Sequence, residues 1–173
     1  MQYREELVKA MKLLSSQENT IFLGQGVVYS GHGMFPTLIN VPMEKRVELP
    51  VMEDAQLGIS IGLALGGYLP ISIYPRMDFL IIAMNQLVNH LDKIEDMSEF
   101  KPKVIIRTAV GSTKPLYPGL QHCQDYTKAL YCLLKNVNVI KLDYAEDIMP
   151  TYRFALADTK SSILIEMADL YNA

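Results

Sequence analysis

The sequence contains no tryptophan and only two cysteines, Cys123 and Cys132. Two cysteines are too few for a disulfide framework, which excludes the class of small, disulfide-stabilised secreted domains. If both lie on one helix, their separation of nine residues puts them on opposite faces, where they could not pair with each other. We therefore expect a reducing compartment, the cytoplasm.

Long apolar runs and a strong charge of either sign are also lacking. No apolar run reaches about 18 residues, so no transmembrane helix is expected. Residues 1–18 are charged and amphipathic rather than a basic segment followed by an apolar run, so no signal peptide is expected. The formal net charge of −3 gives no indication of a nucleic-acid or anionic-membrane partner.

The chain does have enough apolar residues for one core. Of its 173 residues, 50% are hydrophobic and 20% are charged, a globular composition. This length suits one domain over residues 1–173, and there is no linker, internal repeat or low-complexity segment. Ten methionines and ten tyrosines would suit an interface with another chain.

Apolar periodicity predicts alternating strands and helices. Strands are expected at 20–23, 46–49, 69–74, 103–108, 137–142 and 162–166, and helices at 5–14, 54–65, 79–94, 125–134 and 147–158. Because the strands are apolar on both faces, the predicted fold class is α/β, a three-layer α/β/α sandwich with a six-stranded, mainly parallel sheet. Ligands in such sheets bind at the carboxyl ends of the strands. A loop as long as the one expected at 109–121 is usually functional or mobile.

The stretch 49–73 organises the rest of the chain. Glu53 opens the predicted helix, and Gly58, Gly62 and Gly66 then recur every fourth residue on one face. Glycine weakens a helix interior by about 0.5–1 kcal/mol relative to alanine, so three in register need a reason. We expect the glycine face to pack against a second chain and Glu53 to be a buried functional carboxylate. The alternative for Glu53 is a carboxylate that only interacts favourably with the helix macrodipole.

Other candidates lie near the predicted strand ends. Gly24–Gly26 is interpreted as a plain turn, because neither a third glycine at position 29 nor a GK[ST] sequence completes a phosphate loop. His122 could act as an acid, a base or a hydrogen-bond donor, although lone histidines are more often surface or capping residues. His32 is a weaker candidate, and His90, inside a predicted helix, is interpreted as structural. Cys123 is discounted as a nucleophile activated by His122, because the side chains of adjacent residues rarely face each other. No cluster of side chains has the spacing of zinc ligands.

Several motifs carry a resemblance to a known family. Residues 49–73, LPVMEDAQLGISIGLALGGYLPISI, resemble the pyrimidine-binding domain of thiamine diphosphate enzymes. The similarity is closest to the beta subunit of the 2-oxo acid dehydrogenase decarboxylating component and more distant to the central region of transketolase. Residues 77–98 resemble the family's aromatic segment and following helix, Arg107 stands in the place of a strand arginine, and Gln121–Gln124 resembles Gln-His-Ser-Gln. The resemblance covers nearly the whole chain.

The resemblance implies roles for three residues. Glu53 matches the glutamate that hydrogen-bonds the aminopyrimidine nitrogen, which helps the cofactor to lose a proton from its thiazolium carbon. Phe79 matches the aromatic residue that stacks on the pyrimidine. His122 matches the histidine near the reacting carbons, which would hydrogen-bond the substrate or an intermediate. The glycine face would then lie at the subunit contact.

The chain departs from the family pattern at four places. It lacks the Gly-Asp-Gly…Asn motif that holds magnesium and the diphosphate, and it ends at Ala173, before the usual C-terminal domain of the beta subunit. Gln25 and Gly26 stand where acidic residues are usual, and Cys123 replaces a serine. The resemblance therefore implies half of a split enzyme.

In such an enzyme, thiamine diphosphate would lie between this chain and a separate diphosphate-binding subunit, which would supply the magnesium ligands. The assembly would be a homodimer or a heterotetramer. It would act on a 2-oxo acid or a ketose-like donor, by decarboxylation or by two-carbon or acyl transfer.

Two alternatives stay open. A non-catalytic relative used for assembly or regulation is favoured by the missing C-terminal domain and by Gln25 and Gly26, while Glu53, Phe79 and His122 count against it. A flavodoxin-like domain for another ligand also fits the pattern of elements, but the absence of a phosphate loop after the first strand counts against it.

Overall fold

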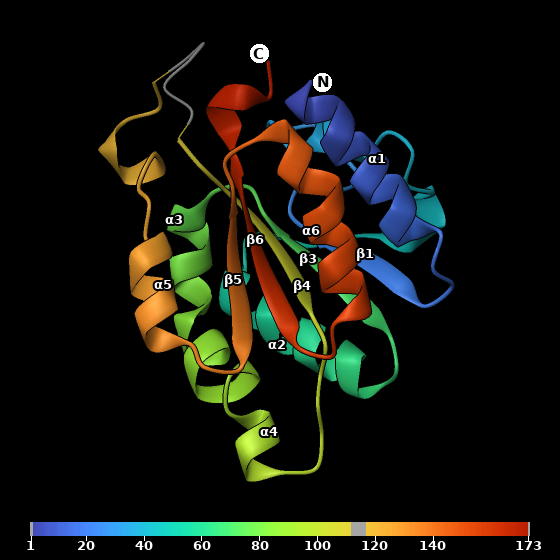
Figure 1. Cartoon of the computed structure of the whole chain (residues 1–173), viewed down its shortest axis with the longest axis vertical. Coiled ribbons are helices and arrows are strands. Elements are labelled where there is room, and N and C mark those ends of the chain that lie inside the picture. The colour runs from blue at the N-terminus through green and yellow to red at the C-terminus, as the bar shows by residue number, and fades with distance from the viewer. Residues whose placement is uncertain (1, 112–116, 173) are drawn as a thin grey trace.

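One six-stranded sheet forms the centre of the computed structural model, which describes residues 2–111 and 117–172 (Figure 1). All neighbouring strands are parallel, in the order β2-β1-β3-β4-β6-β5. The strands are β1 (Thr20–Gly24), β2 (Arg46–Glu48), β3 (Leu69–Tyr74), β4 (Ile105–Val110), β5 (Val137–Leu142) and β6 (Ser161–Met167). The predicted fold class is confirmed.

Helices cover both faces of this sheet. The longer ones are α1 (Tyr3–Ser15), α2 (Glu53–Leu65), α5 (Thr127–Leu133) and α6 (Ala145–Ala157). Figure 1 shows α1 and α6 side by side over one face, and α2 and α5 beyond the other. None of the described helices combines the length and the apolar character needed to cross a bilayer.

Two clusters of buried side chains fill the space between the three layers. Ile105 of β4 belongs to the cluster under α1 and α6, and the next residue, Ile106, belongs to the cluster under α2 and α5. Ile163 and Leu164 of β6 divide in the same way. Successive residues of a strand point to opposite faces, so a sheet covered on both sides needs strands that are apolar throughout, as the sequence predicted.

The predicted helix over 79–94 is not one continuous α-helix. It divides into α3 (Met77–Leu80), a 3₁₀ turn (Ile81–Ala83), a π-helical segment (Gln86–Leu91) and α4 (Ile94–Met97). The N–H of Asp92 donates to the carbonyl of Leu87 across the wide π turn. This extra residue brings Asp92 to a fully buried position, where its carboxylate accepts hydrogen bonds from the N–H groups of Lys135 and Asn136 at 2.8 and 2.7 Å. Apolar periodicity alone does not distinguish the two helix types, because it carries no information about these distant donors.

The loop predicted at 109–121 starts later in the structure than the sequence indicated. Strand β4 continues through Val110, and residues 112–116 of that prediction lie outside the described residues.

A buried ion pair joins the two neighbouring strands β4 and β6. The Nε of Arg107 lies 2.7 Å from Oε1 of Glu166, and its Nη2 lies 3.0 Å from Oε2, with both side chains fully buried. Burial alone would lower the pKa of the guanidinium, but the Glu166 carboxylate raises it above its usual value. The Arg107 guanidinium therefore stays charged inside the protein.

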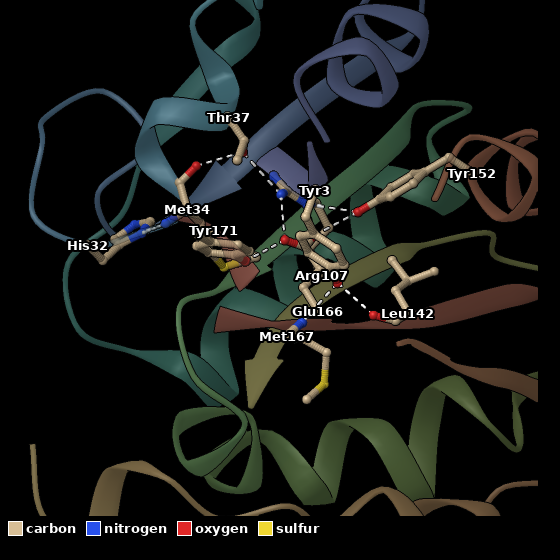
Figure 2. A network of polar contacts seen from close by, with 10 residues as sticks. All are labelled: Tyr3, His32, Met34, Thr37, Arg107, Leu142, Tyr152, Glu166, Met167 and Tyr171. Atoms are coloured by element: carbon tan, nitrogen blue, oxygen red, sulfur yellow. Dashed lines mark hydrogen bonds and ion pairs between the residues drawn. The ribbon is translucent and has the colours of Figure 1, made fainter. Parts of the chain in front are cut away.

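Hydroxyl groups from distant parts of the chain extend this network, as Figure 2 shows. Tyr152 of α6 donates to Oε1 of Glu166 at 2.8 Å, and Tyr171 donates to Oε2 at 2.5 Å. Nη2 of Arg107 donates to the hydroxyl of Thr37 at 3.1 Å. The pair thereby ties β4 and β6 to α6, to the loop after β1 and to the C-terminal segment.

Replacing Tyr171 with phenylalanine tests this network. We expect Tyr171→Phe to lower the free energy of unfolding by about 1.5–3 kcal/mol, because it removes a hydrogen bond to a buried charged group. Urea unfolding of both proteins gives the difference. Tyr144→Phe is the matched control, since Tyr144 is 64% exposed and should change stability by no more than about 0.5 kcal/mol. Equal effects of the two substitutions would contradict the role assigned to Tyr171.

Candidate active site

A cavity of about 600 Å³ opens at the carboxyl ends of the strands. Its walls come from the segments that follow four different strands, namely 25–36 after β1, 75–79 after β3, 109–111 at the end of β4 and 168–172 after β6. Strand β1 lies between β2 and β3, so the chain leaves β1 toward one side and returns to the other. Ligands of open α/β sheets bind at such a switch point, in agreement with the strand-end prediction.

The loop after β1 is held by a carboxylate of the neighbouring strand. Oxygens of Glu48 accept hydrogen bonds from the N–H groups of Gly26, Val27 and Val28 at 2.5, 2.9 and 2.7 Å. Burial alone would raise the pKa of Glu48, but these N–H groups outweigh it and lower the pKa below its ordinary value. The N–H groups that a phosphate would need are therefore occupied by the chain itself, which agrees with the interpretation of Gly24–Gly26 as a plain turn.

His32 closes the same loop from its other end. Its Nε2 lies 2.8 Å from the carbonyl oxygen of Gln25. Its Nδ1 accepts a hydrogen bond from the N–H of Met34 at 3.2 Å (Figure 2). These partners require the neutral tautomer with the proton on Nε2. Burial lowers the pKa of His32 below its ordinary value, and the nearby Arg107 contributes in the same direction. His32 in its neutral form thus holds the loop through two hydrogen bonds.

The structure brings two of the predicted site residues together. The rings of Phe79 and His122 meet edge to face, with their centroids 5.6 Å apart. Phe79 also lines the cavity. Nη1 of Arg76 donates to the backbone carbonyl of His122 at 2.6 Å, which ties the segment after β3 to the segment before α5.

Glu53, the third predicted site residue, lies at the start of α2. It is the first residue of α2, it is 9% exposed, and its backbone carbonyl accepts a hydrogen bond from Tyr74 at 3.3 Å. Within the described residues, no group donates a hydrogen bond to its carboxylate, and Glu53 is not among the residues that line the cavity. Among the described residues, Phe79 therefore lines the cavity and Glu53 does not.

The glycine-spaced face of α2 is only partly covered by this chain. Gly58 faces the side chain of Gln86, whereas Gly62 and Gly66 are exposed. Ile59 and Leu65 beside them are also exposed, at 41% and 43%. Packing of this face against a second chain stays a prediction.

Sequence reasoning gave no role to Glu48 and did not consider Arg76. Glu48 lies inside a predicted strand, so its contact with a loop about 20 residues earlier left no local signal. Arg76 lies two residues after the end of β3, and its place at a strand end was the one signal that could have identified it. His90 is exposed in the π-helical segment and contributes nothing to the core.

Comparisons with known proteins agree with this architecture. No family model matches the chain. The chain is 24% identical to the pyruvate dehydrogenase E1 component subunit beta of Mycoplasma genitalium, over 98% of this chain and 53% of that protein. It is 28% identical to the mitochondrial subunit beta of Saccharomyces cerevisiae, over 99% of this chain and 48% of that protein. The chain thus spans about half the length of these relatives.

Solved structures show the same fold. A split gene transketolase, an inactive beta4 tetramer, superposes with a TM-score of 0.72 at 17% identity, over 96% of this chain and 50% of that one. Transketolase from Campylobacter jejuni gives a TM-score of 0.77 at 14% identity, over 96% of this chain and 25% of that one. The resemblance predicted from the sequence is confirmed.

Gly26 provides a test of the loop after β1. Its φ of +70° lies in the left-handed region, and a Cβ there would come within 2.5 Å of the His32 ring. We expect Gly26→Ala to lower the free energy of unfolding by at least about 1–2 kcal/mol. Gly31→Ala is the matched control, because an added Cβ at Gly31 meets nothing within 4 Å. Urea unfolding separates the two, and a Gly26 variant as stable as the Gly31 variant would contradict this account of the loop.

His32 makes stability depend on pH. Because folding lowers its pKa, protonation favours the unfolded chain, so stability is complete above the ordinary pKa of 6.5 and falls as the pH drops toward the folded value. We expect the melting temperature of His32→Gln to fall less between pH 7.5 and 5.5 than that of the wild type. His90→Gln, an exposed control, should follow the wild type. Parallel curves for all three proteins would rule out the His32 contribution.

Proposed function

We propose that this chain is a single pyrimidine-binding domain that forms one subunit of a split, thiamine diphosphate-dependent enzyme. The enzyme acts on a 2-oxo acid or a ketose-like donor, by decarboxylation or by two-carbon or acyl transfer. The observation that carries this proposal is similarity to E1 beta subunits over nearly the whole chain, together with the transketolase fold. The edge-to-face pair of Phe79 and His122 beside a strand-end cavity supports it.

The residues of the chain fit the aminopyrimidine ring of the cofactor. Glu53 offers a carboxylate that no described residue hydrogen-bonds, although the side chain is 9% exposed. A nearly buried acceptor without a donor is unfavourable until a ligand supplies one, and a protonated ring nitrogen would do so. Phe79 offers a partly exposed flat face against which an aromatic ring can pack.

Each residue then has a distinct task. When bound, thiamine diphosphate supplies the carbon nucleophile that adds to a substrate carbonyl. Glu53 holds and exchanges a proton at its carboxylate oxygen, and Phe79 orients the ring. His122, held through its backbone by Arg76, presents an imidazole that donates a hydrogen bond to the substrate oxygen.

A second subunit completes the site in this proposal. In the part of the chain that the structure describes, no group of three or more His, Cys, Asp or Glu side chains could hold a metal ion. The magnesium and diphosphate ligands would therefore come from the diphosphate-binding subunit, in a heterotetramer or across a homodimer. The exposed Gly62 and Gly66, with Ile59 and Leu65, form the apolar face that would contact another chain.

A non-catalytic role in assembly or regulation is the second candidate. It is supported by one solved structure with this fold, a split gene transketolase described as an inactive beta4 tetramer. Purification of the native complex, followed by analysis for thiamine diphosphate and magnesium, separates the two candidates. A chain that stays free of cofactor when the diphosphate-binding subunit is added would favour the second.

Glu53→Gln in the purified complex tests the mechanism. With hydroxypyruvate as donor and CO₂ release as readout, we expect kcat to fall by at least about 100-fold, because the carboxylate can no longer exchange a proton. Glu44→Gln, a change at an exposed glutamate, is the control and should keep wild-type turnover. Turnover of Glu53→Gln near the wild-type rate, with the complex intact, would refute the role of Glu53.

A further inference from the structure

The cavity at the strand ends carries two arginines, Arg4 and Arg76, in its lining. Across residues 2–111 and 117–172, neither of them forms an ion pair. By contrast, the buried Arg107 forms an ion pair with Glu166 through its Nε and Nη2. Within the described residues, the cavity therefore contains two cationic side chains that have no ion-pair partner.

Arg76 is positioned by a single hydrogen bond. Its Nη1 donates to the carbonyl of His122, and its other N–H donors have no partner among the described residues. An arginine has five N–H donors in a planar fork that matches carboxylate and phosphate oxygens. Because one arm is held against the segment that carries His122, the remaining donors are oriented before any ligand arrives.

Arg4 approaches the same cavity from α1. Its Nη2 donates to the side-chain oxygen of Asn172, and its Nε is buried without a partner. A buried N–H that lacks an acceptor is unfavourable, so an anion in the cavity would relieve this cost. The two arginines belong to segments more than 70 residues apart in the sequence and share only the cavity.

The acidic side chain in the lining does not neutralise these cations. Among the described residues of that lining, Glu48 is the one with a carboxylate, and it already accepts three backbone hydrogen bonds from the loop after β1. His32 contributes no charge near neutral pH, because its pKa is lowered and both ring nitrogens are engaged. The free donors in the cavity thus favour a small oxyanion.

We propose that Arg76, assisted by Arg4, binds the anionic group of the substrate, a carboxylate or a phosphate ester, and thereby determines which donors the enzyme accepts. This inference rests on the proposed function for the identity of the ligand as a substrate. The contact between Arg76 and the His122 backbone would place the anionic end of the donor close to His122. For a 2-oxo acid, whose carboxylate adjoins the reacting carbonyl, this placement brings that carbonyl to the imidazole.

A binding experiment on the full chain tests the site without any turnover. We would titrate the isotope-labelled chain with pyruvate, with inorganic phosphate and with methyl pyruvate, an uncharged analogue, and follow amide shifts by NMR.

We expect Arg76→Gln to weaken binding of the preferred anion at least about tenfold and Arg4→Gln to weaken it less. Arg76→Lys, which keeps the charge without the fork, should fall between Arg76→Gln and the wild type. Arg153→Gln, at an exposed position on α6, is the matched control and should bind like the wild type.

The anion that binds more tightly shows which anionic group of the donor the site recognises. Stronger binding of pyruvate assigns the site to a substrate carboxylate, and stronger binding of phosphate assigns it to a phosphorylated donor. Binding of neither anion by the wild type, or equal affinities of wild type and Arg76→Gln, would overturn the proposal. So would equal binding of methyl pyruvate and pyruvate, because the site would then not recognise charge.

Measurements on the complex separate this inference from the proposed function. In a complex that binds thiamine diphosphate, we expect Arg76→Gln to raise KM for the anionic donor about tenfold and to leave cofactor affinity unchanged. Loss of cofactor affinity instead would assign Arg76 to the cofactor diphosphate and overturn the substrate role. If the complex binds no cofactor at all, the proposed function fails, while the NMR titration still decides whether Arg76 forms an anion site.

Discussion

The buried pair of Arg107 and Glu166 is the interaction on which the rest of the structure depends. Removing one member of such a pair leaves an uncompensated charge and typically costs about 3–5 kcal/mol, so the two strands that carry the pair cannot change register independently.

Both strands that carry the pair lead directly into the cavity. Ala109 and Gly111 follow Arg107, and Ala168 and Tyr171 follow Glu166 in the cavity lining. The hydroxyl of Thr37 attaches the loop after β1 to the same pair. One charged contact therefore holds three walls of the candidate site.

Two kinds of polar group surround that site. The first kind is satisfied within the chain. Glu48 accepts three backbone N–H groups, and His32 forms hydrogen bonds at both ring nitrogens. The second kind, Glu53, Arg4 and Arg76, keeps acceptors or donors without partners in the described chain. A fold normally satisfies its polar groups, so those it leaves open indicate where a ligand or another subunit is expected.

These open groups have opposite charges and different positions. Glu53 begins α2, beside the exposed apolar face of that helix, whereas the arginines line the cavity. In the proposed enzyme, the carboxylate would meet the cofactor ring, and the arginines would meet the anionic end of the donor. Phe79 and His122 are connected to the arginine-lined cavity, since Phe79 lines it and Arg76 holds the backbone of His122. A binding partner that covers α2 would complete a site of which this chain forms one part.

The sequence by itself determined the fold class and the identity of the candidate residues. Strands that are apolar on both faces and alternate with helices require a covered parallel sheet, because only that arrangement buries both faces. The resemblance singled out Glu53, Phe79 and His122 by their motifs. Only the tertiary structure decided that Phe79 and His122 touch, that Arg107 and Glu166 pair across 59 residues of sequence, and that the helix after β3 changes to a π turn. Periodicity records the hydrogen-bonding pattern of neighbouring residues and the face that each side chain occupies. Contacts such as those of Arg76 and Glu48 depend instead on which strand ends and loops meet in space, and that is settled only when the whole sheet has assembled.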